Sequence, residues 1–547
     1  MKIKLLLVLI ILLGAYVRFY KLDWGQGLFT HPDEYHIVIS ANQLSFPTQM
    51  HPHFFSYGTV TIYLIYFTKL FLHSFGIIDP NLFLIGRFYS ALFSTLTIFI
   101  IYKIGQFFFN KNYALLASFL VAFTPGLIQQ AHFATPESNL TFFLFGSLLF
   151  LLNFIKKQQL KWLILASIFF GLALGIKISS AVFAITFLIP ILATVKKFSL
   201  KPIFLSSLIF ITTLTTFFIV APFNFLDLRG LQNSMAYEGG LAVGKFVVFY
   251  TRQFIDTVPM LFQLEKILPF ALGPALMLFG LLGFLYLLFF TLKTKNILFF
   301  LLLTSFLSLF LSNSFLFAKW TRFLAPTFPF FAIFASYFIF KLNQLKTFRS
   351  LFIILESFFL SLVLLWAFAF MQIYVRNDIR ISANSWLINN TTPSSTFLVE
   401  GGNMIDIPLR APNRLSLDFY NLDEVQISSS AYNLEQDALA REKIIDALDQ
   451  SDYFILQSRR VFANHQRQAS LFPKTAAFYQ KLFAGTLGFK QIKEFTSYPG
   501  IDFYGYNLQI PDEGAEETWS VFDHPVIRVF QKNAKLSKDI YAKSFED

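Results

Sequence analysis

Two adjacent carboxylates, Asp33 and Glu34, directly follow the first apolar stretch of the chain. The first 370 residues otherwise contain few acids, so this pair is conspicuous. Ionised groups beside a lipid bilayer must offset their desolvation, and such groups mark catalytic or substrate sites. A carboxylate there can accept the proton of a hydroxyl group within hydrogen-bond reach. Alternatively, the two acids only favour the start of a helix at Pro32, where they would complement the helix dipole.

Four histidines crowd the same part of the chain: His31, His36, His51 and His53. With Asp33 or Glu34 they could form a zinc site, but their spacings match no closed ligand pattern. We therefore predict no metal site from a motif, although a divalent metal stays possible. His31, Tyr35 and His36 are instead candidates for binding substrate hydroxyls.

The composition is that of a membrane protein. Of the 547 residues, 55% are hydrophobic and only 14% are charged, against about 25% in soluble domains. There are 75 phenylalanines, and the mean hydropathy is +0.57. No cysteine is present, which excludes disulfides and thiolate metal sites.

Apolar runs long enough to cross a bilayer predict a polytopic α-helical membrane protein with about eleven transmembrane helices. The first run contains Arg18 and lacks a small-residue cleavage site, so we interpret it as a span and not as a signal peptide. The predicted spans are 5–20, 84–102, 113–131, 139–155, 162–176, 180–195, 202–221, 267–291, 297–312, 323–340 and 349–370.

The distribution of basic residues predicts the orientation. With the N-terminus in the cytoplasm, the cytoplasmic segments contain fifteen lysines and arginines and no acid, as the positive-inside rule expects. The isoelectric point of 9.4 therefore reflects topology and not a nucleic-acid partner. These segments are the N-terminus and residues 103–112, 156–161, 196–201, 292–296 and 341–349.

Residues 57–75 are also apolar, but counting them as a span would move every lysine-rich loop to the outer face. We interpret them as a juxtamembrane or re-entrant helix within residues 21–80. With an odd number of spans and a cytoplasmic N-terminus, Asp33, Glu34 and the chain after residue 370 lie outside the cytoplasm. The protein is then a multi-pass component of the plasma (inner) membrane.

Residues 371–547 are predicted to form an extracytoplasmic α/β or α+β domain, distinct from the transmembrane domain 1–370. Short strands alternate with helices along this part of the chain. The predicted strands are 396–400, 453–456, 489–495 and 526–530, and the predicted helices are 378–390, 435–449 and 473–484.

A further acid, Glu137, lies at the outer end of the third and fourth spans, on the predicted face of Asp33. It could orient an acceptor or a metal. Alternatively, Thr135 is an N-cap with Pro136 at the first helical position, and Glu137 favours the helix dipole.

Four cations lie at outer helix ends, where the cytoplasmic charge bias does not explain them: Arg87, Lys177, Lys319 and Arg322. Buried cations at this depth suit a lipid phosphate. The alternative for each is snorkelling to the interface or pairing with a loop acid. Glu356, in the last span, has no predicted role.

Several motifs together resemble the phospholipid-carrier-dependent glycosyltransferases of the GT-C superfamily, which include protein O-mannosyltransferases and the lipid A aminoarabinose transferase. The resemblance covers residues 1–370. It rests on Asp33-Glu34, residues 86–93 (GRFYSALF), 135–137 (TPE), 171–177 (GLALGIK) and 322–326 (RFLAP). The tail is similar to the outer domain of bacterial members at residues 386–390 and 523–525.

The resemblance implies transfer of a sugar from a polyprenyl-phosphate carrier to an acceptor hydroxyl on a protein, glycan or lipid, with inversion. It implies that Asp33 is the general base, that Glu34 positions it or the acceptor, and that Glu137 is the second-loop acid. The carrier phosphate would be bound by the cations Arg87, Lys177 and Arg322. Residues 31–36 depart from the commonest subfamily patterns, which leaves the acceptor open. The first outer loop contains no Asp-x-Asp motif of the kind that metal-dependent oligosaccharyltransferase relatives use.

A transporter or flippase of lipid-linked glycans is the alternative, because it too would bind a lipid phosphate with cations. It would need charges along both halves of its pathway. The predicted spans contain almost no acid other than Glu356 at depth, which favours the transferase.

Overall fold

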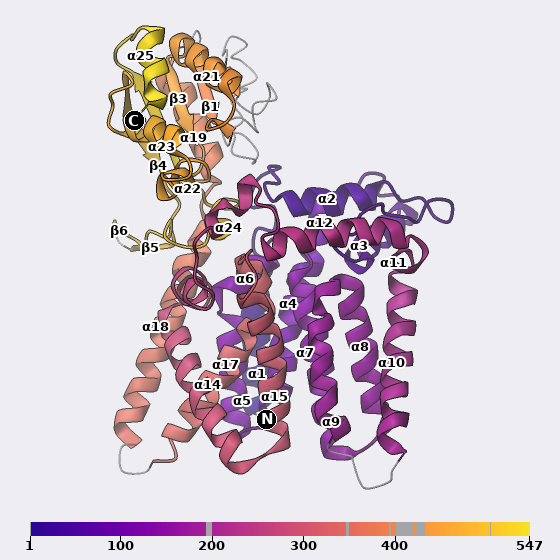
Figure 1. The fold of residues 1–547 in the computed structure, drawn as a ribbon. Helices are drawn as coiled ribbons and strands as arrows, with labels where there is room; N and C mark the ends of the chain where they lie inside the picture. The colour runs from indigo at the N-terminus through magenta and orange to yellow at the C-terminus, as the bar shows by residue number, and fades with distance from the viewer. Residues whose placement is uncertain are drawn as a thin grey trace. The chain divides into compact units, whose positions relative to one another are not determined.

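The structure is a computed structural model that describes residues 2–192, 200–345, 349–392, 395–400, 419–421, 433–503 and 505–546 (Figure 1). It forms two compact units. The first consists of residues 1–22, 32–246 and 257–371, and the second of residues 23–31, 247–256 and 372–547. The second unit therefore includes two short segments from within the N-terminal part of the chain.

The regular elements of the first unit are all helices among its described residues (Figure 1). Its long helices are α1 (Lys2–Phe19), α4 (Leu82–Gly105), α5 (Lys111–Ala122), α7 (Glu137–Lys157), α8 (Leu160–Ile176), α10 (Lys201–Val220), α14 (Pro274–Thr294), α15 (Ile297–Ser314), α17 (Phe328–Leu342) and α18 (Arg349–Val375). Its other helices are α2 (Pro32–Asn42), α3 (Thr59–Ser74), α6 (Pro125–Ala131), η1 (Ile178–Phe187), α9 (Leu188–Leu192), α11 (Phe223–Leu226), α12 (Leu228–Val243), η3 (Gln263–Ile267), α13 (Leu268–Ala271), α16 (Thr321–Leu324) and η4 (Ala325–Thr327).

Within the described residues, the predicted spans fall on helical segments, but fewer of them meet the length and hydropathy expected of a span. Seven helices among the described residues do so, and the bent pair α5–α6 would make eight. Residues 160–176 and 178–192 form shorter apolar helices, and α1 is not among the candidates. By length and composition alone, these candidates are fewer than the about eleven spans predicted. The predicted span 180–195 and the basic segments around Lys196 and Lys346 lie partly outside the described residues.

Arg18 interrupts the apolar run of α1, and the structure gives it a packing role. Its side chain is fully buried. It donates to the carbonyls of Val121 (2.9 Å) and Ala122 (2.8 Å), at the C-terminal end of α5. A helix end leaves carbonyls without intrahelical partners, and a cation there is favourable. Arg18 thus stabilises the 56° bend between α5 and α6.

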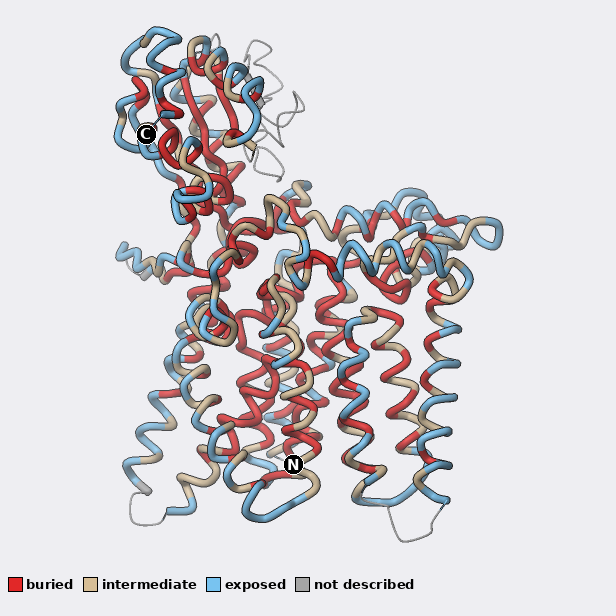
Figure 2. Tube along the Cα trace, viewed as in Figure 1, coloured by how far each residue is buried: buried red, intermediate tan, exposed pale blue. Residues whose placement is uncertain are grey.

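The apolar residues 57–75 form α3, which is not among the candidate spans, as predicted. α3 packs against α2 through a small core of buried residues. In Figure 2 buried residues are concentrated on the helices at the centre of the bundle, whereas α10 and α18 expose much of their length. The core between α2 and α3 consists of Ile37, Val38, Ala41, Leu44, Tyr57, Ile62, Ile65, Tyr66 and Leu82.

The second unit contains a five-stranded mixed sheet in the order β2-β1-β3-β7-β4. β1 pairs in parallel with β2 and β3, whereas β7 pairs antiparallel with β3 and β4. The strands are β1 (Phe397–Glu400), β2 (Phe419–Asn421), β3 (Tyr453–Leu456), β4 (Phe489–Phe495) and β7 (Ile527–Lys532), and a separate hairpin consists of β5 (Gly500–Phe503) and β6 (Tyr506–Gln509).

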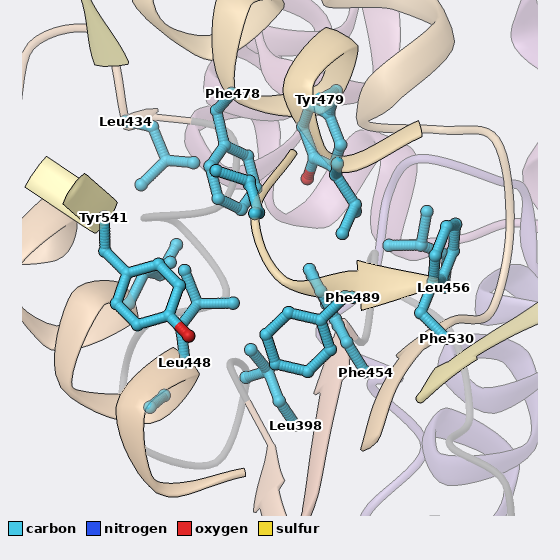
Figure 3. Packing of buried hydrophobic residues seen from close by; sticks show 14 of the residues in the cluster. Leu398, Leu434, Leu448, Phe454, Leu456, Phe478, Tyr479, Phe489, Phe530 and Tyr541 are labelled. Atoms are coloured by element: carbon cyan, nitrogen blue, oxygen red, sulfur yellow. The ribbon is translucent and has the colours of Figure 1, made fainter. Parts of the chain in front are cut away.

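Helices cover this sheet and bury an aromatic core (Figure 3). Phe454, Phe489 and Phe530 contribute from three strands, and Phe478 and Tyr479 from a helix. The helices and turns of the unit are η2 (Phe249–Phe254), α19 (Ile379–Asn390), α21 (Ala438–Gln450), α22 (Phe462–Arg467), α23 (Pro473–Phe483), α24 (Glu517–Ser520), α25 (Lys538–Ala542) and η7 (Lys543–Phe545).

The sequence predicted this unit well. β3 and β4 have the predicted bounds, and α19, α21, α23, β1 and β7 differ by one to three residues at their ends. A mixed sheet with helices is the small C-terminal α/β or α+β domain expected. The strands β2, β5 and β6 were not predicted.

Candidate active site

Asp33 lies in the first turn of α2, one residue after Pro32. Its Oδ2 atom accepts a hydrogen bond of 2.7 Å from the Tyr57 hydroxyl and lies 3.4 Å from Nη1 of Arg322. The side chains of Asp33 and Arg322 are 18% and 15% exposed, so both are reachable from solvent. Proline at the first helical position and acids in the first turn are also what the helix-start interpretation predicts.

Glu34, the neighbour of Asp33, is held very differently. Its carboxylate forms a bidentate pair with Arg87, with Nε–Oε1 and Nη2–Oε2 distances of 2.8 and 2.9 Å. It also accepts from the backbone N–H of Ala134 at 2.6 Å. Arg87 uses its remaining nitrogen, Nη1, on the carbonyl of Leu22 at 2.7 Å. Both charged side chains are fully buried, so this pair fixes the start of α2 and with it the position of Asp33.

Glu137 and Lys177 form a second ion pair. The Lys177 ammonium lies 3.1 Å from Oε1 of Glu137, and the two side chains are 12% and 1% exposed. Glu137 Oε2 is buried and has no hydrogen-bond partner among the described residues. The N-cap of α7 is Pro136, with no side-chain cap, so the prediction that Thr135 caps this helix was wrong by one residue.

Aromatic rings connect the two ion pairs. The Lys177 ammonium lies 4.5 Å from the ring centre of Phe323 and 5.4 Å from that of Tyr57, the residue that binds Asp33. The Arg322 guanidinium lies 4.8 Å from the ring centre of Trp320. Such cation–π contacts hold the cations in place and leave their charge available to an anion.

A close backbone approach brings Tyr57 and Lys177 together. The N–H of Gly58 donates to the carbonyl of Ile176 at 2.8 Å. A Cβ atom on Gly58 would lie 2.0 Å from the carbonyl oxygen of Gly175, which is closer than real Cβ atoms come. Only glycine permits this contact. It positions the loop before α3 against the end of α8, where Lys177 follows.

The electrostatics keep Tyr57 neutral. Burial, reinforced by the charge of Asp33, raises the pKa of the Tyr57 hydroxyl well above its usual value, although Arg322 opposes this. Tyr57 therefore remains a proton donor to Asp33 at physiological pH.

The structure thus brings together Asp33, Glu137, Lys177 and Arg322 of the predicted site residues. It adds Tyr57, which the sequence analysis did not identify. No sequence pattern singles out Tyr57, because its role depends on the Gly58–Gly175 contact between segments far apart in the chain.

The other predicted residues lie elsewhere. Lys319 is buried and donates to Thr257 Oγ1 and the carbonyl of Phe317, both at 3.0 Å. Burial lowers the pKa of Lys319. Tyr35 packs its ring 5.2 Å from Phe83.

The histidines also have local partners. His36 stacks on Phe54 at 5.8 Å. His31 belongs to the second unit, where its ring lies 4.3 Å from that of Phe522. His51 pairs with Asp227 at 3.2 Å.

Among the described residues, no group of three or more His, Asp or Glu side chains is placed to hold a metal ion.

Glu356, whose role the sequence left open, accepts a hydrogen bond of 2.8 Å from Asn343.

An apolar cavity of about 470 Å³ lies among α8, η1, α9 and α10. Leu174, three residues before Lys177, is part of its lining. Its walls are otherwise mainly aliphatic and aromatic, and include Phe170, Phe187, Ile191, Phe210 and Phe217. The volume is in the range of small-molecule and lipid sites.

The second unit contains a buried charged cluster that the sequence analysis noted only as the motif 523–525. His524 contacts Asp523 through Nδ1 at 2.5 Å and Asp512 through Nε2 at 2.8 Å. Burial alone would lower the pKa of His524, but the two carboxylates outweigh it and raise the pKa to about 10. The ring is therefore an imidazolium that binds both acids and ties the 512–524 segment together.

Comparisons with known proteins connect this geometry to a family. Residues 60–225 match the family model described as dolichyl-phosphate-mannose-protein mannosyltransferase. This match includes Arg87, Glu137 and Lys177. The comparison with curated protein sequences found no significant match.

Solved structures of low sequence identity have a similar fold. The Archaeoglobus fulgidus oligosaccharyltransferase in complex with Zn and sulfate aligns with a TM-score of 0.54 and 15% identity, covering 86% of this chain and 71% of that one. The same organism's AglB with an inhibitory peptide and dolichol-phosphate gives a TM-score of 0.53 and 14% identity, over 95% and 78%. ArnT from Cupriavidus metallidurans bound to undecaprenyl phosphate gives a TM-score of 0.46 and 13% identity, over 85% and 94%.

The two Archaeoglobus fulgidus matches, with TM-scores above 0.5, show a common fold, and identities this low leave the substrates open. The family match covers the helices that carry Arg87, Glu137 and Lys177. Residues 60–225 are therefore similar to the dolichyl-phosphate-mannose-protein mannosyltransferase family, and the chain shares its fold with the Archaeoglobus fulgidus oligosaccharyltransferase.

Proposed function

We propose that the protein transfers a sugar from a polyprenyl-phosphate carrier to an acceptor hydroxyl on the extracytoplasmic side of the plasma membrane, with inversion at the anomeric carbon. The observation that carries this proposal is the contact of Asp33 with Tyr57 and Arg322, next to the Lys177–Glu137 pair. The Asp33 carboxylate and two partly exposed cations, Arg322 and Lys177, therefore lie in one group of side chains.

In the proposed reaction, Asp33 accepts the proton of the acceptor hydroxyl. The hydroxyl oxygen attacks the anomeric carbon while the bond from that carbon to the carrier phosphate breaks. The departing phosphate gains negative charge, which Arg322 and Lys177 stabilise. A single displacement of this kind inverts the anomeric centre.

Glu34 and Arg87 support this site indirectly. Arg87 is completely buried and its guanidinium nitrogens are bound by Glu34 and Leu22. We therefore leave Arg87 and Lys319 out of the proposed phosphate site, in contrast to the expectation from the sequence. Glu34 acts as a positioning residue for Asp33 and not as a catalytic residue.

The apolar cavity suits the lipid part of the donor. Its lining includes Leu174 on α8, three residues before Lys177, which follows the last residue of that helix. We propose that the polyprenyl chain occupies it while the phosphate contacts Lys177. The extracytoplasmic orientation is supported by the lysine-rich segments at the opposite helix ends, such as Lys156 and Lys157 at the end of α7, which begins at Glu137.

Reconstitution into liposomes tests this proposal against the flippase alternative. Purified protein is supplied with a synthetic polyprenyl-phosphate sugar and a mixture of envelope acceptors. Formation of a glycosidic bond and release of polyprenyl phosphate would support transfer. Movement of the donor between leaflets with no glycosidic product would favour the flippase.

A further inference from the structure

The β5–β6 hairpin of the second unit has one apolar face and one polar face. Side chains alternate between faces along each strand, and residues directly opposite each other share a face. The register pairs Ile501 with Leu508 and Asp502 with Asn507. Ile501, Leu508 and Tyr506 therefore lie on one face of the hairpin. The other face carries Asp502, Asn507 and Gln509.

The apolar face is exposed to an unusual degree. Tyr506 is 81% exposed and Leu508 is 63% exposed. The hairpin forms a sheet of its own and does not join the five-stranded sheet. In Figure 2 much of it is coloured as exposed. Two-stranded hairpins are marginally stable in water. An exposed apolar face on such a hairpin indicates that another surface binds to it.

A membrane-spanning helix ends next to this hairpin. Arg376, the residue directly after α18, donates through Nη1 to the carbonyl of Tyr498 at 3.1 Å and pairs through Nη2 with Asp502 at 3.0 Å. The segment Ser350–Val375 is one of the candidate spans. Its 26 residues extend about 39 Å, whereas the hydrocarbon core of a bilayer is about 30 Å thick. The end of α18 therefore reaches the headgroup layer.

Val375, the last residue of α18 and the neighbour of Arg376, is itself 40% exposed. Tyrosine is enriched where a protein crosses from lipid to water, because its ring is apolar and its hydroxyl is polar. The Arg376–Asp502 pair holds the polar face of the hairpin beside the residue that follows α18.

We propose that the β5–β6 hairpin inserts its Ile501, Tyr506 and Leu508 face into the boundary between headgroups and acyl chains, and so anchors the second unit to the lipid surface. The partner is the membrane itself. This proposal does not depend on the sugar-transfer reaction.

The absence of native cysteine makes the test direct, since one introduced cysteine is a unique labelling site. Leu508→Cys and Tyr506→Cys are labelled with an environment-sensitive nitrobenzoxadiazole dye. Asn507→Cys, on the opposite face and also exposed, is the matched control. The full-length protein is reconstituted in vesicles of phosphatidylethanolamine and phosphatidylglycerol, with and without lipids spin-labelled near the headgroup.

We expect blue-shifted emission and several-fold stronger quenching by the spin-labelled lipids at 506 and 508 than at 507. Equal, water-like emission at all three positions would overturn the proposal. Blue-shifted emission at 508 that spin-labelled lipid does not quench would also overturn it, because it would indicate a protein partner. Gel filtration of each labelled variant confirms that it is folded.

Discussion

The Tyr57 hydroxyl donates a 2.7 Å hydrogen bond to the same Asp33 oxygen that faces Arg322. One carboxylate is thus held between a neutral donor and a cation. The proton acceptor of the proposed reaction is consequently oriented before a substrate arrives, which lowers the reorganisation needed for transfer.

Tyr57→Phe is predicted to reduce kcat with little change in the KM for the donor. The substitution removes one hydrogen bond to a charged group, an interaction of about 1.5–3 kcal/mol, or roughly 10–100-fold in rate. Steady-state kinetics with the lipid donor would measure the two constants separately. An unchanged kcat would remove Tyr57 from the mechanism.

Gly58→Ala adds only one methyl group but is predicted to reduce the transfer activity strongly. A Cβ atom there would meet the carbonyl oxygen of Gly175 at 2.0 Å, so the two backbones would have to separate. This would move Tyr57 away from Lys177. We expect a large loss of transfer. Gly239→Ala, whose new Cβ would meet nothing within 4 Å, is the matched control and should retain full activity.

Lys177→Met is predicted to raise the KM for the polyprenyl-phosphate donor by roughly 10–100-fold, because a charge-assisted contact to the phosphate is lost. Since the substitution also leaves Glu137 buried without its partner, Lys177→Met combined with Glu137→Gln separates the two effects. Lys177→Arg should keep most of the donor affinity. Donor binding as tight in the double variant as in the native protein would contradict a phosphate role.

The Glu34–Arg87 pair is predicted to matter for stability. Breaking a buried ion pair by removing one partner costs about 3–5 kcal/mol, because it leaves the other charge uncompensated. Arg87→Met should therefore lower the unfolding temperature strongly. Replacing both residues, with Glu34→Gln and Arg87→Met, should recover part of this loss. An equally large loss in the double variant would argue that the carboxylate binds mainly to Ala134.

Much of the fold follows from the sequence, for identifiable reasons. β3 is an apolar run between Asp452 and Gln457, so its bounds were clear from composition. Fewer helices than the eleven predicted spans meet the length and hydropathy of a span among the described residues, because apolar helices such as residues 178–192 resemble spans in composition but are shorter.

The site was predicted less completely. The sequence presents Arg87 and Lys177 alike, as single cations at outer helix ends. Only the folded chain shows that Arg87 is enclosed by Glu34 and Leu22, whereas Lys177 remains partly exposed beside Tyr57. Such distinctions depend on contacts between segments that are far apart in the chain.

The most direct test of the account is the activity of Asp33→Asn in reconstituted protein. This variant keeps the shape of the side chain but cannot accept the acceptor's proton. We predict that sugar transfer falls by at least 100-fold while binding of the polyprenyl-phosphate donor, measured in the same vesicles, is retained. Transfer at the native rate in Asp33→Asn would contradict it.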